Sequence, residues 1–403
     1  MLNNYKSCEI IKYGDVMKKK KIAMILVTQP KRGGGHQYAL MVAKCLKELP
    51  ASKYELVSIC NNSFWTKWSK ENGITYFHFN EIEPETKNIL YNLKFPFFSR
   101  IYNLYVTELG RIVRKEKIDV LFATAQMYVP NLNVKIILPV HDLMHRYENS
   151  FPEVKNEYYR REAVFKVQAR FADYIFTDSD LGKKQFEEAY LKKYTKKPNI
   201  VVLPFVVSDH ISKMREKYVE VPFPYVFYPA QFWMHKNHIN LIKAIQILKK
   251  EIEEIHLVLV GCEKNCLREI KKYIVANGLD NNVTIKGFVS DENITFLYRH
   301  ALGMIMPSYF GPTNIPPLEA MALGCPVAVS DRYAMPEQVG DAGLLFDPDS
   351  PDEIADCIRK IWTDAELREE LIGKGYRKIS TWTERDFRKK VLKVVKRCCN
   401  DIK

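Results

Sequence analysis

The segment from Met304 to Ser330, MIMPSYFGPTNIPPLEAMALGCPVAVS, carries the residues best suited to chemistry. Its pattern predicts a buried strand, a loop of Gly, Pro, Thr and Asn, a helix from about Pro316 to Leu323, and a second strand after Gly324. A helix N-terminus offers unpaired N–H groups and a positive dipole end, which suit a phosphate. Glu319 is expected in the first helical turn, where its carboxylate is suited to accept hydrogen bonds from a ribose diol.

Three other positions place suitable groups at the ends of predicted strands. Gly33, Gly34 and Gly35 follow the first strand, where glycines let the backbone approach a phosphate; the alternative is a plain turn. Lys236 lies between a strand and a helix and is placed to neutralise a diphosphate; the alternative is a solvated lysine. His141 ends a strand, where its imidazole is suited to bond a sugar hydroxyl, unless it is a satisfied core histidine.

Two Asp-x-Asp triplets and one cysteine pair are the possible metal ligands. Asp178–Asp180 leads into a predicted helix, so it is better explained as a helix N-cap, and Asp347–Asp349 lies in a predicted turn. Cys262 and Cys266 have no second Cys/His pair nearby to complete a zinc site. The sequence therefore predicts no metal and no other cofactor.

The basic charge of the chain is concentrated in its first half. The net charge is +13, and residues 1–205 carry 33 Lys+Arg against 21 Asp+Glu, whereas the rest is nearly neutral. This excess favours an anionic partner such as a membrane surface. Residues 88–117 mix aromatic and basic side chains, which indicates either a membrane-facing surface or a packed helix with a solvated basic face. No nucleic-acid recognition motif accompanies the charge, so we expect no nucleic-acid partner.

Cysteine usage and hydropathy point to the cytoplasm. The nine cysteines show no disulfide framework, which is typical of a reducing compartment. No apolar run approaches the roughly 18 residues of a transmembrane helix, and the basic stretch before Ile22 is better explained as the start of a strand than as a signal peptide. We expect a cytoplasmic protein, at most peripheral at the inner face of the membrane.

Short β-branched runs alternate with amphipathic stretches, which predicts two parallel, doubly wound sheets in an α/β protein. The predicted strands are Ile22–Val27, Tyr54–Ile59, Thr75–Phe79, Val120–Ala123, Lys135–Val140, Tyr174–Thr177, Asn199–Leu203, Tyr225–Pro229, His256–Gly261, Val283–Lys286, Gly303–Met306 and Pro326–Ser330. The predicted helices are Gln37–Glu48, Lys87–Lys117, Tyr158–Phe171, Gly182–Tyr190, His238–Lys250, Cys266–Asn277, Asp291–His300, Pro317–Leu323, Asp352–Trp362 and Glu384–Cys399. We expect Rossmann-like domains at residues 1–205 and 206–383, and a final helix at residues 384–403 that returns toward the first domain.

The order of these motifs resembles that of GT-B glycosyltransferases of the GT4 type. That family has a Glu, seven residues and a second Glu before a helix of small residues and a Gly-x-Pro-Val strand. Here the second Glu is Glu319, and the first position is Gly311, which begins GPTN. The resemblance also covers the glycine loop, the HDL at His141, the lysine of HKNH, a Gly-Phe-Val turn and the segment PEQVGDAGLLFDP. It implies two Rossmann-like domains that face each other across a central cleft.

The resemblance also implies roles for individual residues. Glu319 would hold the donor ribose, Lys236 would stabilise the leaving diphosphate, and His141 would face the donor sugar. Thr313 and Asn314 would take over the sugar-hydroxyl contacts of the family's first Glu. The implied donor-binding residues are Gly34, Gly35, Gly287, Phe288, Val289, Gly311, Thr313, Asn314, Ile315 and Glu319.

The implied activity is that of a retaining glycosyltransferase that works without a metal ion. Its donor would be GDP-mannose or a UDP-sugar, and its acceptor a saccharide or a lipid-diphosphate-linked saccharide in surface polysaccharide biosynthesis. Two alternatives stay open at this point. A nucleotide-sugar epimerase of the same fold would turn over without an acceptor, and a non-catalytic partner protein would bind the nucleotide sugar without transfer or hydrolysis.

Overall fold

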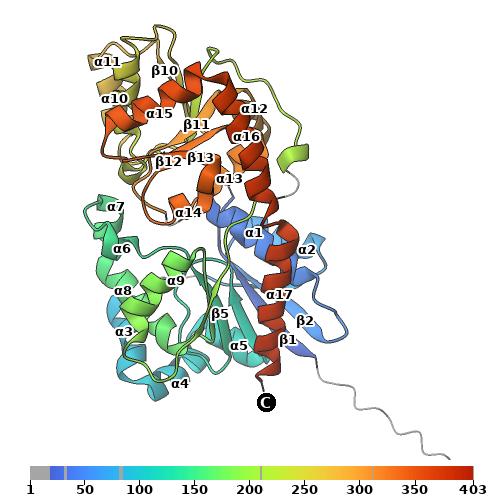
Figure 1. The fold of residues 1–403 in the computed structure, drawn as a ribbon. Helices are drawn as coiled ribbons and strands as arrows, with labels where there is room; N and C mark the ends of the chain where they lie inside the picture. The colour runs from blue at the N-terminus through green and yellow to red at the C-terminus, as the bar shows by residue number, and fades with distance from the viewer. Residues whose placement is uncertain (1–18, 31–33, 81–84, 209–210, 312, 403) are drawn as a thin grey trace, which may run out of the picture.

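The computed structural model describes residues 19–30, 34–80, 85–208, 211–311 and 313–402, so Gly33 of the glycine loop lies outside the described residues. Two parallel sheets lie one in each half of the chain, and Figure 1 shows the two halves stacked with α1 at their junction. The expected fold class of two Rossmann-like domains is confirmed.

The N-terminal sheet has seven strands in the order β3-β2-β1-β4-β5-β6-β7. Every neighbouring pair is parallel, as repeated strand–helix units require. Its strands are β1 (Lys20–Leu26), β2 (Tyr54–Cys60), β3 (Thr75–His78), β4 (Val120–Ala123), β5 (Lys135–Val140), β6 (Tyr174–Thr177) and β7 (Asn199–Val202). Each of them overlaps a predicted strand.

The C-terminal sheet has six parallel strands in the order β10-β9-β8-β11-β12-β13. They are β8 (Val226–Pro229), β9 (Leu257–Val260), β10 (Val283–Lys286), β11 (Gly303–Met306), β12 (Val327–Ser330) and β13 (Gly343–Phe346). The prediction lacked β13, which is a short edge strand that is only partly buried and so has a weak hydrophobic signal.

The helices of the N-terminal half are α1 (Gly34–Lys47), α2 (Ser63–Glu71), α3 (Thr86–Lys94), α4 (Pro96–Val106), α5 (Glu108–Lys115), α6 (Met144–Tyr147), α7 (Pro152–Lys155), α8 (Tyr158–Phe171) and α9 (Asp180–Phe186), followed by a π-helical turn, η1 (Glu187–Leu191). The single helix predicted over residues 87–117 is wrong. Pro96 lacks an N–H and therefore ends α3 and begins α4, and Thr107 caps α5 by accepting a hydrogen bond from the N–H of Gly110.

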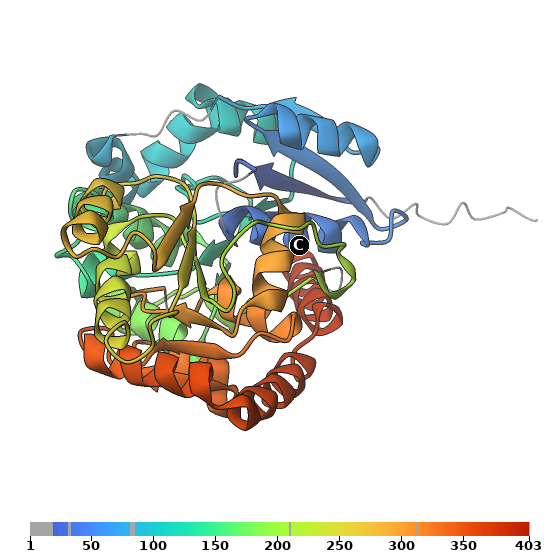
Figure 2. The ribbon, with the colours of Figure 1, turned by 90° about the horizontal axis from the view of Figure 1, so that it is seen from above.

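The helices of the C-terminal half are α10 (His238–Leu248), α11 (Leu267–Ala276), α12 (Asp291–His300), α13 (Ile315–Ala322), α14 (Met335–Val339), α15 (Pro351–Thr363), α16 (Ala365–Ser380) and α17 (Glu384–Asn400), with short 3₁₀ turns η2 (Ile211–Lys213), η3 (Met234–Lys236) and η4 (Gly340–Ala342). Seen from above, α15, α16 and α17 run along one outer side of the molecule (Figure 2). The prediction lacked α14 and α16.

Helix α17 leaves the C-terminal half and packs on the N-terminal half (Figure 1). Its buried Phe387, Val391 and Val395 belong to the same hydrophobic cluster as β1 and α1. Just before it, the indole N–H of Trp382 donates to the carbonyl of Pro204. The two halves of the chain are therefore joined along α17 by apolar packing.

Within the described part of the chain, every helix is too short or insufficiently apolar to span a lipid bilayer.

Candidate active site

The loops that face each other between the two sheets follow the strands at the switch point of each sheet, where the order of the strands reverses. The order reverses between β1 and β4 in the first sheet and between β8 and β11 in the second. In open α/β sheets, ligands bind at such switch points, at the carboxyl ends of the strands. Gly34 follows β1, Lys236 follows β8, and the loop with Gly311 follows β11, so the structure brings these three predicted positions to the two switch points.

The glycine loop touches the start of α13 directly. A Cβ built on Gly34 would lie 2.7 Å from Cδ1 of Ile315, so a side chain at this position requires movement of Ile315. The close approach of the two backbones is the physical reason for a glycine here. A Cβ on Gly35, by contrast, would have no other group within 4 Å, so this position borders open space.

Glu319 lies on α13 and receives two hydrogen bonds. Nε2 of Gln37 on α1 donates to Oε1 at 3.1 Å, and the hydroxyl of Tyr298 on α12 donates to Oε2 at 3.1 Å. Its removal from solvent raises the pKa of the Glu319 carboxyl above its usual value, and the two donors oppose that rise. The prediction that Glu319 lies in the first turn is wrong, because the N-cap is Asn314 and the helix begins at Ile315.

Lys236 ends the 3₁₀ turn η3, directly before α10. Its Nζ donates to Oγ of Ser308 and to Oδ1 of Asn314, each at 3.3 Å. Desolvation lowers the pKa of Lys236 to about 8, while the carboxylate of Asp142 in the other half of the chain opposes this shift. Lys236 is therefore a largely desolvated cation near neutrality, held against the loop that precedes α13.

The loop before α13 has a conformation that depends on glycine. Gly311 has a φ of +105°, a value that L-residues rarely adopt. A Cβ at Gly311 would also lie 2.8 Å from Nδ2 of Asn314, whose amide donates to the carbonyl of Gly311. A carboxylate side chain at this position is therefore incompatible with the observed loop.

Thr313 bridges the two halves of the chain. Its N–H and its hydroxyl both donate to Oδ2 of Asp178, which follows β6 in the N-terminal sheet. Asp178 is 3% exposed, and burial raises the pKa of its carboxyl to about 7 despite these bonds. The sequence analysis attributed the Asp178–Asp180 triplet to a helix cap, and Ser179 does cap α9, but the bridge from Asp178 was not predicted.

Two N–H groups just before α13 have protein partners in this structure. The N–H of Thr313 donates to Asp178, and the N–H of Asn314 donates to Oε1 of Gln338, 2.9 Å away. In turn, the side-chain amide of Gln338 donates to the carbonyl of Asn314. A phosphate at this helix end would therefore compete with side chains for these donors.

His141 follows β5 and lies beside α1. Its ring meets the ring of Tyr38 edge-on, with centroids 4.7 Å apart, and lies 5.5 Å from the ring of Phe205. Its backbone N–H donates to the side-chain oxygen of Gln126. Burial lowers the pKa of His141 to about 4, so the imidazole is neutral at physiological pH. A neutral imidazole is suited to bond a hydroxyl and unsuited to supply a positive charge.

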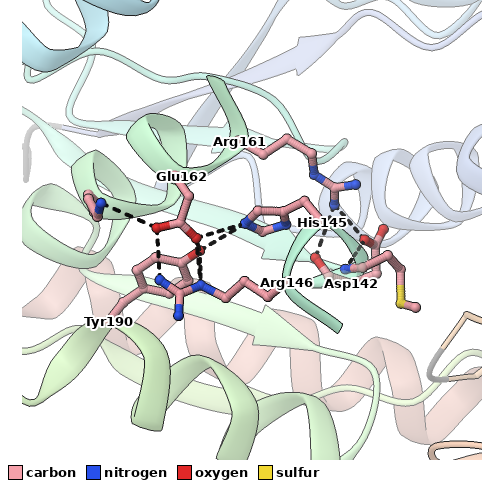
Figure 3. A network of polar contacts seen from close by, with 8 residues as sticks. Asp142, His145, Arg146, Arg161, Glu162 and Tyr190 are labelled. Carbon is pink, nitrogen blue, oxygen red and sulfur yellow. Dashed lines mark hydrogen bonds and ion pairs between the residues drawn. The ribbon is translucent and has the colours of Figure 1, made fainter. Parts of the chain in front are cut away.

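A buried ionic network, drawn in Figure 3, holds the segment after His141 in place. Glu162 on α8 accepts from the hydroxyl of Tyr190 at 2.7 Å and from the guanidinium of Arg146, and it contacts the ring of His145. Beside it, Arg161 binds the carboxylate of Asp142. Directly bonded members of this network are up to 45 positions apart in the chain, so no local pattern indicates it.

Gly287, Phe288 and Val289 follow β10, two strands away from β8. The N–H of Gly261 after β9 donates to the carbonyl of Gly287, so these residues share the carboxyl edge of the sheet. Phe288 is 50% exposed. The structure thus places this turn on the same edge as Lys236 but toward the outer end of the sheet.

A second bridge joins the segment Glu148–Glu153 of the N-terminal half to the C-terminal half. Oε1 of Glu153 on α7 contacts Nδ1 of His235, and its Oε2 accepts from Asn265 at 2.9 Å. Phe151 packs against the ring of Tyr309, with centroids 5.3 Å apart. The facing loops are therefore already in contact, and the cleft is closed on this side.

Several cavities lie beside these contacts, and one of about 570 Å³ is lined by Asp178, Thr313 and Gln338. A second of about 440 Å³ is lined by Gly35, Gln126 and Arg161, and it lies on the N-terminal side. Another of about 280 Å³ is lined by Gln37, Glu319 and residues of α12. Among the described residues, no group of three His, Cys, Asp or Glu side chains converges as metal ligands would.

Comparison with known proteins finds a family model that matches part of the chain. Residues 210–378 match the model of the family "Glycosyl transferases group 1". The chain is 24% identical over 266 residues to the O-antigen chain mannosyltransferase B of Escherichia coli, covering 64% of this chain and 69% of that protein. It is also 24% identical over 250 residues to the serotype-specific mannosyltransferase WbdA of Escherichia coli, covering 60% of this chain but only 29% of that longer protein.

Solved structures share the fold over nearly the whole chain. The sucrose-phosphate synthase of Thermosynechococcus elongatus has a TM-score of 0.70 at 16% identity, covering 95% of this chain and all of that one. Anabaena Alr3699/HepE in complex with UDP-glucose has a TM-score of 0.68 at 16% identity, covering 93% of this chain and 99% of that one. The chain has the GT-B fold, residues 210–378 match the group 1 glycosyl transferases, and these similarities support a transferase.

Proposed function

We propose that this protein transfers a sugar from a nucleotide diphosphate sugar to a saccharide or lipid-linked saccharide, with retention of anomeric configuration, in surface polysaccharide biosynthesis. The observation that carries the proposal is the contact between the two switch points. Gly34 meets Ile315, and Gln37 meets Glu319, across the cleft that also holds Lys236. The mannosyltransferases among the relatives favour GDP-mannose, and the HepE complex makes a UDP-sugar the second choice.

In this proposal the donor lies along the start of α13. Glu319 accepts the ribose hydroxyls in place of the bonds it now receives from Gln37 and Tyr298. Lys236 leaves Asn314 and Ser308 to neutralise the diphosphate, and binding of that anion raises its pKa again. A desolvated cation that is already in place stabilises the leaving group without a metal ion.

The sugar-facing side of the site uses neutral groups. His141 is a neutral imidazole, and the loop that begins at Gly311 offers amides and hydroxyls instead of a carboxylate. Because no carboxylate occupies position 311, a covalent glycosyl intermediate has no candidate nucleophile there. Attack of the acceptor on the same face as the departing diphosphate is the mechanism that we propose.

The test is a Glu319→Ala variant assayed with GDP-mannose and a panel of UDP-sugars. We expect donor affinity, measured by calorimetry, and kcat/KM for transfer to fall by about ten- to a hundredfold, because charge-assisted hydrogen bonds are lost. A Gln37→Ala variant is the matched control: it removes the bond across the cleft, leaves the carboxylate, and should change donor affinity far less.

The outcomes separate this proposal from its alternatives. Transfer at the wild-type rate by Glu319→Ala would overturn the assignment of this site. Turnover of the donor without any acceptor would point to an epimerase, and donor binding without transfer or hydrolysis would point to a non-catalytic partner protein. The configuration of the product's new linkage, read by NMR, tests retention.

A further inference from the structure

The two helices α3 and α4 expose an unusual number of large apolar side chains. Phe97 and Phe98, at the start of α4, are 66% and 62% exposed. We define the aromatic face as the exposed apolar residues of this region, which are Leu90, Tyr91, Phe95, Phe97, Phe98, Ile101, Tyr102, Tyr105 and Val106. Single exposed apolar residues are ordinary, but a contiguous cluster indicates a surface that contacts something other than water.

The inner side of α4 is polar. Its buried residues are Ser99 and Asn103, and the amide of Asn103 donates to Oδ1 of the buried Asn92 and to the carbonyl of Asn131. The amide of Asn131 in turn donates to the carbonyl of Pro96 at the start of α4. Hydrogen bonds thus fix α4 to the domain, while its apolar residues point outward.

Close backbone packing adds to this attachment. A Cβ at Gly110 of α5 would lie 1.7 Å from the carbonyl oxygen of Asn103, so α5 can approach α4 only at a glycine. Helix α4 is therefore firmly seated and has its polarity reversed relative to a normal surface helix, which buries its apolar side. Such a reversal leaves a large apolar surface exposed to water, which is the mark of a surface that contacts another phase or partner.

Basic side chains surround the aromatic face. Lys94 lies over the ring of Phe95, and Arg114 lies over the ring of Tyr105. Across residues 87–117 the sequence has seven Lys or Arg and two acids, Glu108 and Glu116. Both acids are already engaged, with the N–H of Asn80 and with Lys21, respectively. The rim of the face is therefore positively charged.

We propose that the aromatic face of α3 and α4 docks into the interface of an anionic phospholipid bilayer. Aromatic side chains at the depth of the headgroups, with bases beside them, are the arrangement that such an interface favours. A second copy of this chain would bring an equally basic rim, and the like charges would repel. Figure 1 shows α4 at the end of the N-terminal half that is turned away from the C-terminal half, so docking there leaves that half outside the bilayer.

A cavity beside the aromatic face shares lining residues with a cavity near the candidate site. It has a volume of about 730 Å³ and is lined by Tyr91 and Tyr102 of the face and by Tyr128 and Arg160. Tyr128 and Arg160 also line the cavity that holds Gly35. The two cavities therefore adjoin at Tyr128 and Arg160, so docking of the face would place the bilayer surface near the acceptor side of the cleft; that last point rests on the proposed function, whereas the docking itself does not.

The test measures binding to sedimented vesicles of phosphatidylcholine, with and without phosphatidylglycerol, and needs no substrate. We expect binding only to the anionic vesicles and a loss of binding at high salt. A Phe97→Ser/Phe98→Ser variant should lower the partition coefficient at least about tenfold. A Lys94→Gln/Arg114→Gln variant should lower it by roughly fivefold for each base removed.

The matched control is Tyr218→Ser/Val275→Ser, which removes two apolar side chains of the C-terminal half that are 72% and 67% exposed. It should bind vesicles as the wild type does. Equal binding by the phenylalanine variant and the wild type, or no binding to anionic vesicles by either, would overturn the proposal. A wild-type protein that instead forms dimers through this face, detected by sedimentation velocity and abolished in the phenylalanine variant, would overturn it as well.

Discussion

At the residue scale, two buried ionisable groups beside the loop before α13 have shifted pKa values. Lys236 has its pKa lowered to about 8, and Asp178 has its pKa raised to about 7, in both cases chiefly because they are removed from water. Asp178 is bound by Thr313, and Lys236 by Asn314, so both end on the loop before α13. The strength of the contacts that hold that loop therefore depends on pH near neutrality.

We predict that the Asp178→Asn variant has a higher free energy of unfolding than the wild type in alkaline solution but not in acidic solution. The raised pKa means that the folded state keeps a proton that the unfolded state has lost, so stability falls as pH rises from 3.8 to about 7. Asparagine cannot ionise and is free of this penalty. The free energy of unfolding of the variant relative to the wild type should rise by on the order of 4 kcal/mol between about pH 4 and about pH 8.

Denaturant unfolding of both proteins across this range measures the effect. Asp180→Asn, at an exposed position two residues away, is the control and should follow the wild-type curve. Parallel curves for Asp178→Asn and the wild type would show that Asp178 carries no buried charge in the folded state.

At the element scale, α13 and the loop before it form the centre of the site. The loop is determined by Gly311, whose positive φ and close contact with Asn314 exclude a side chain. The helix that follows ends with Gly324 at a φ of +72°, the left-handed position expected for it. The departure from the family's first Glu is thus part of the loop's conformation and not an isolated substitution.

We predict that Gly311→Ala lowers stability by about 1–3 kcal/mol, because an L-residue is strained at this φ. Gly311→Glu should lower the transfer rate further and should not gain activity. Thermal unfolding and a transfer assay measure the two effects. Gly373→Ala in the interior of α16, where a Cβ makes only an ordinary contact with Arg377, is the control and should stabilise by up to about 1 kcal/mol, because alanine favours a helix. A faster Gly311→Glu enzyme would contradict this account of the loop.

At the scale of the whole molecule, the two halves are held together in two places. Helix α17 provides apolar packing, and the facing loops provide contacts across the cleft. Helix α17 buries Phe387 and Val391 against the N-terminal half. The bridges across the cleft include the polar pairs of Thr313 with Asp178 and His235 with Glu153, beside the packing of Phe151 on Tyr309. Water can replace polar partners at a small net cost in free energy, so we expect the cleft side to open for ligands.

We predict that Glu153→Ala shifts the free protein toward an open cleft. Loss of the contacts with His235 and Asn265 removes charge-assisted hydrogen bonds, which changes the opening equilibrium by about tenfold. Small-angle scattering should show a larger radius of gyration without ligand, and a saturating donor should reduce the difference. Lys155→Ala, an exposed change on the same helix, is the control. An unchanged radius would show that this bridge does not hold the cleft closed.

The elements that could be predicted from sequence are those whose signal is local. Val120–Ala123, Lys135–Val140 and Tyr174–Thr177 have the predicted bounds, because continuous apolar runs identify central parallel strands. The first turn of α13 was misplaced because its cap, Asn314, makes no side-chain capping bond. Edge strand β13 and helix α16 bury too little apolar surface for a clear periodic pattern.

The sequence alone indicated the two parallel sheets, because strand and turn preferences act over a few residues. It also indicated that a glycine loop, a lysine and a glutamate follow each other in the order found in GT-B enzymes. The pairing of Asp178 with Thr313, 135 positions apart, depended on how the two sheets dock. The outward direction of the apolar side of α4 likewise depended on packing, because periodicity defines two helix faces but not which one is buried. Long-range contacts make that choice, and here buried asparagines hold the polar face inside.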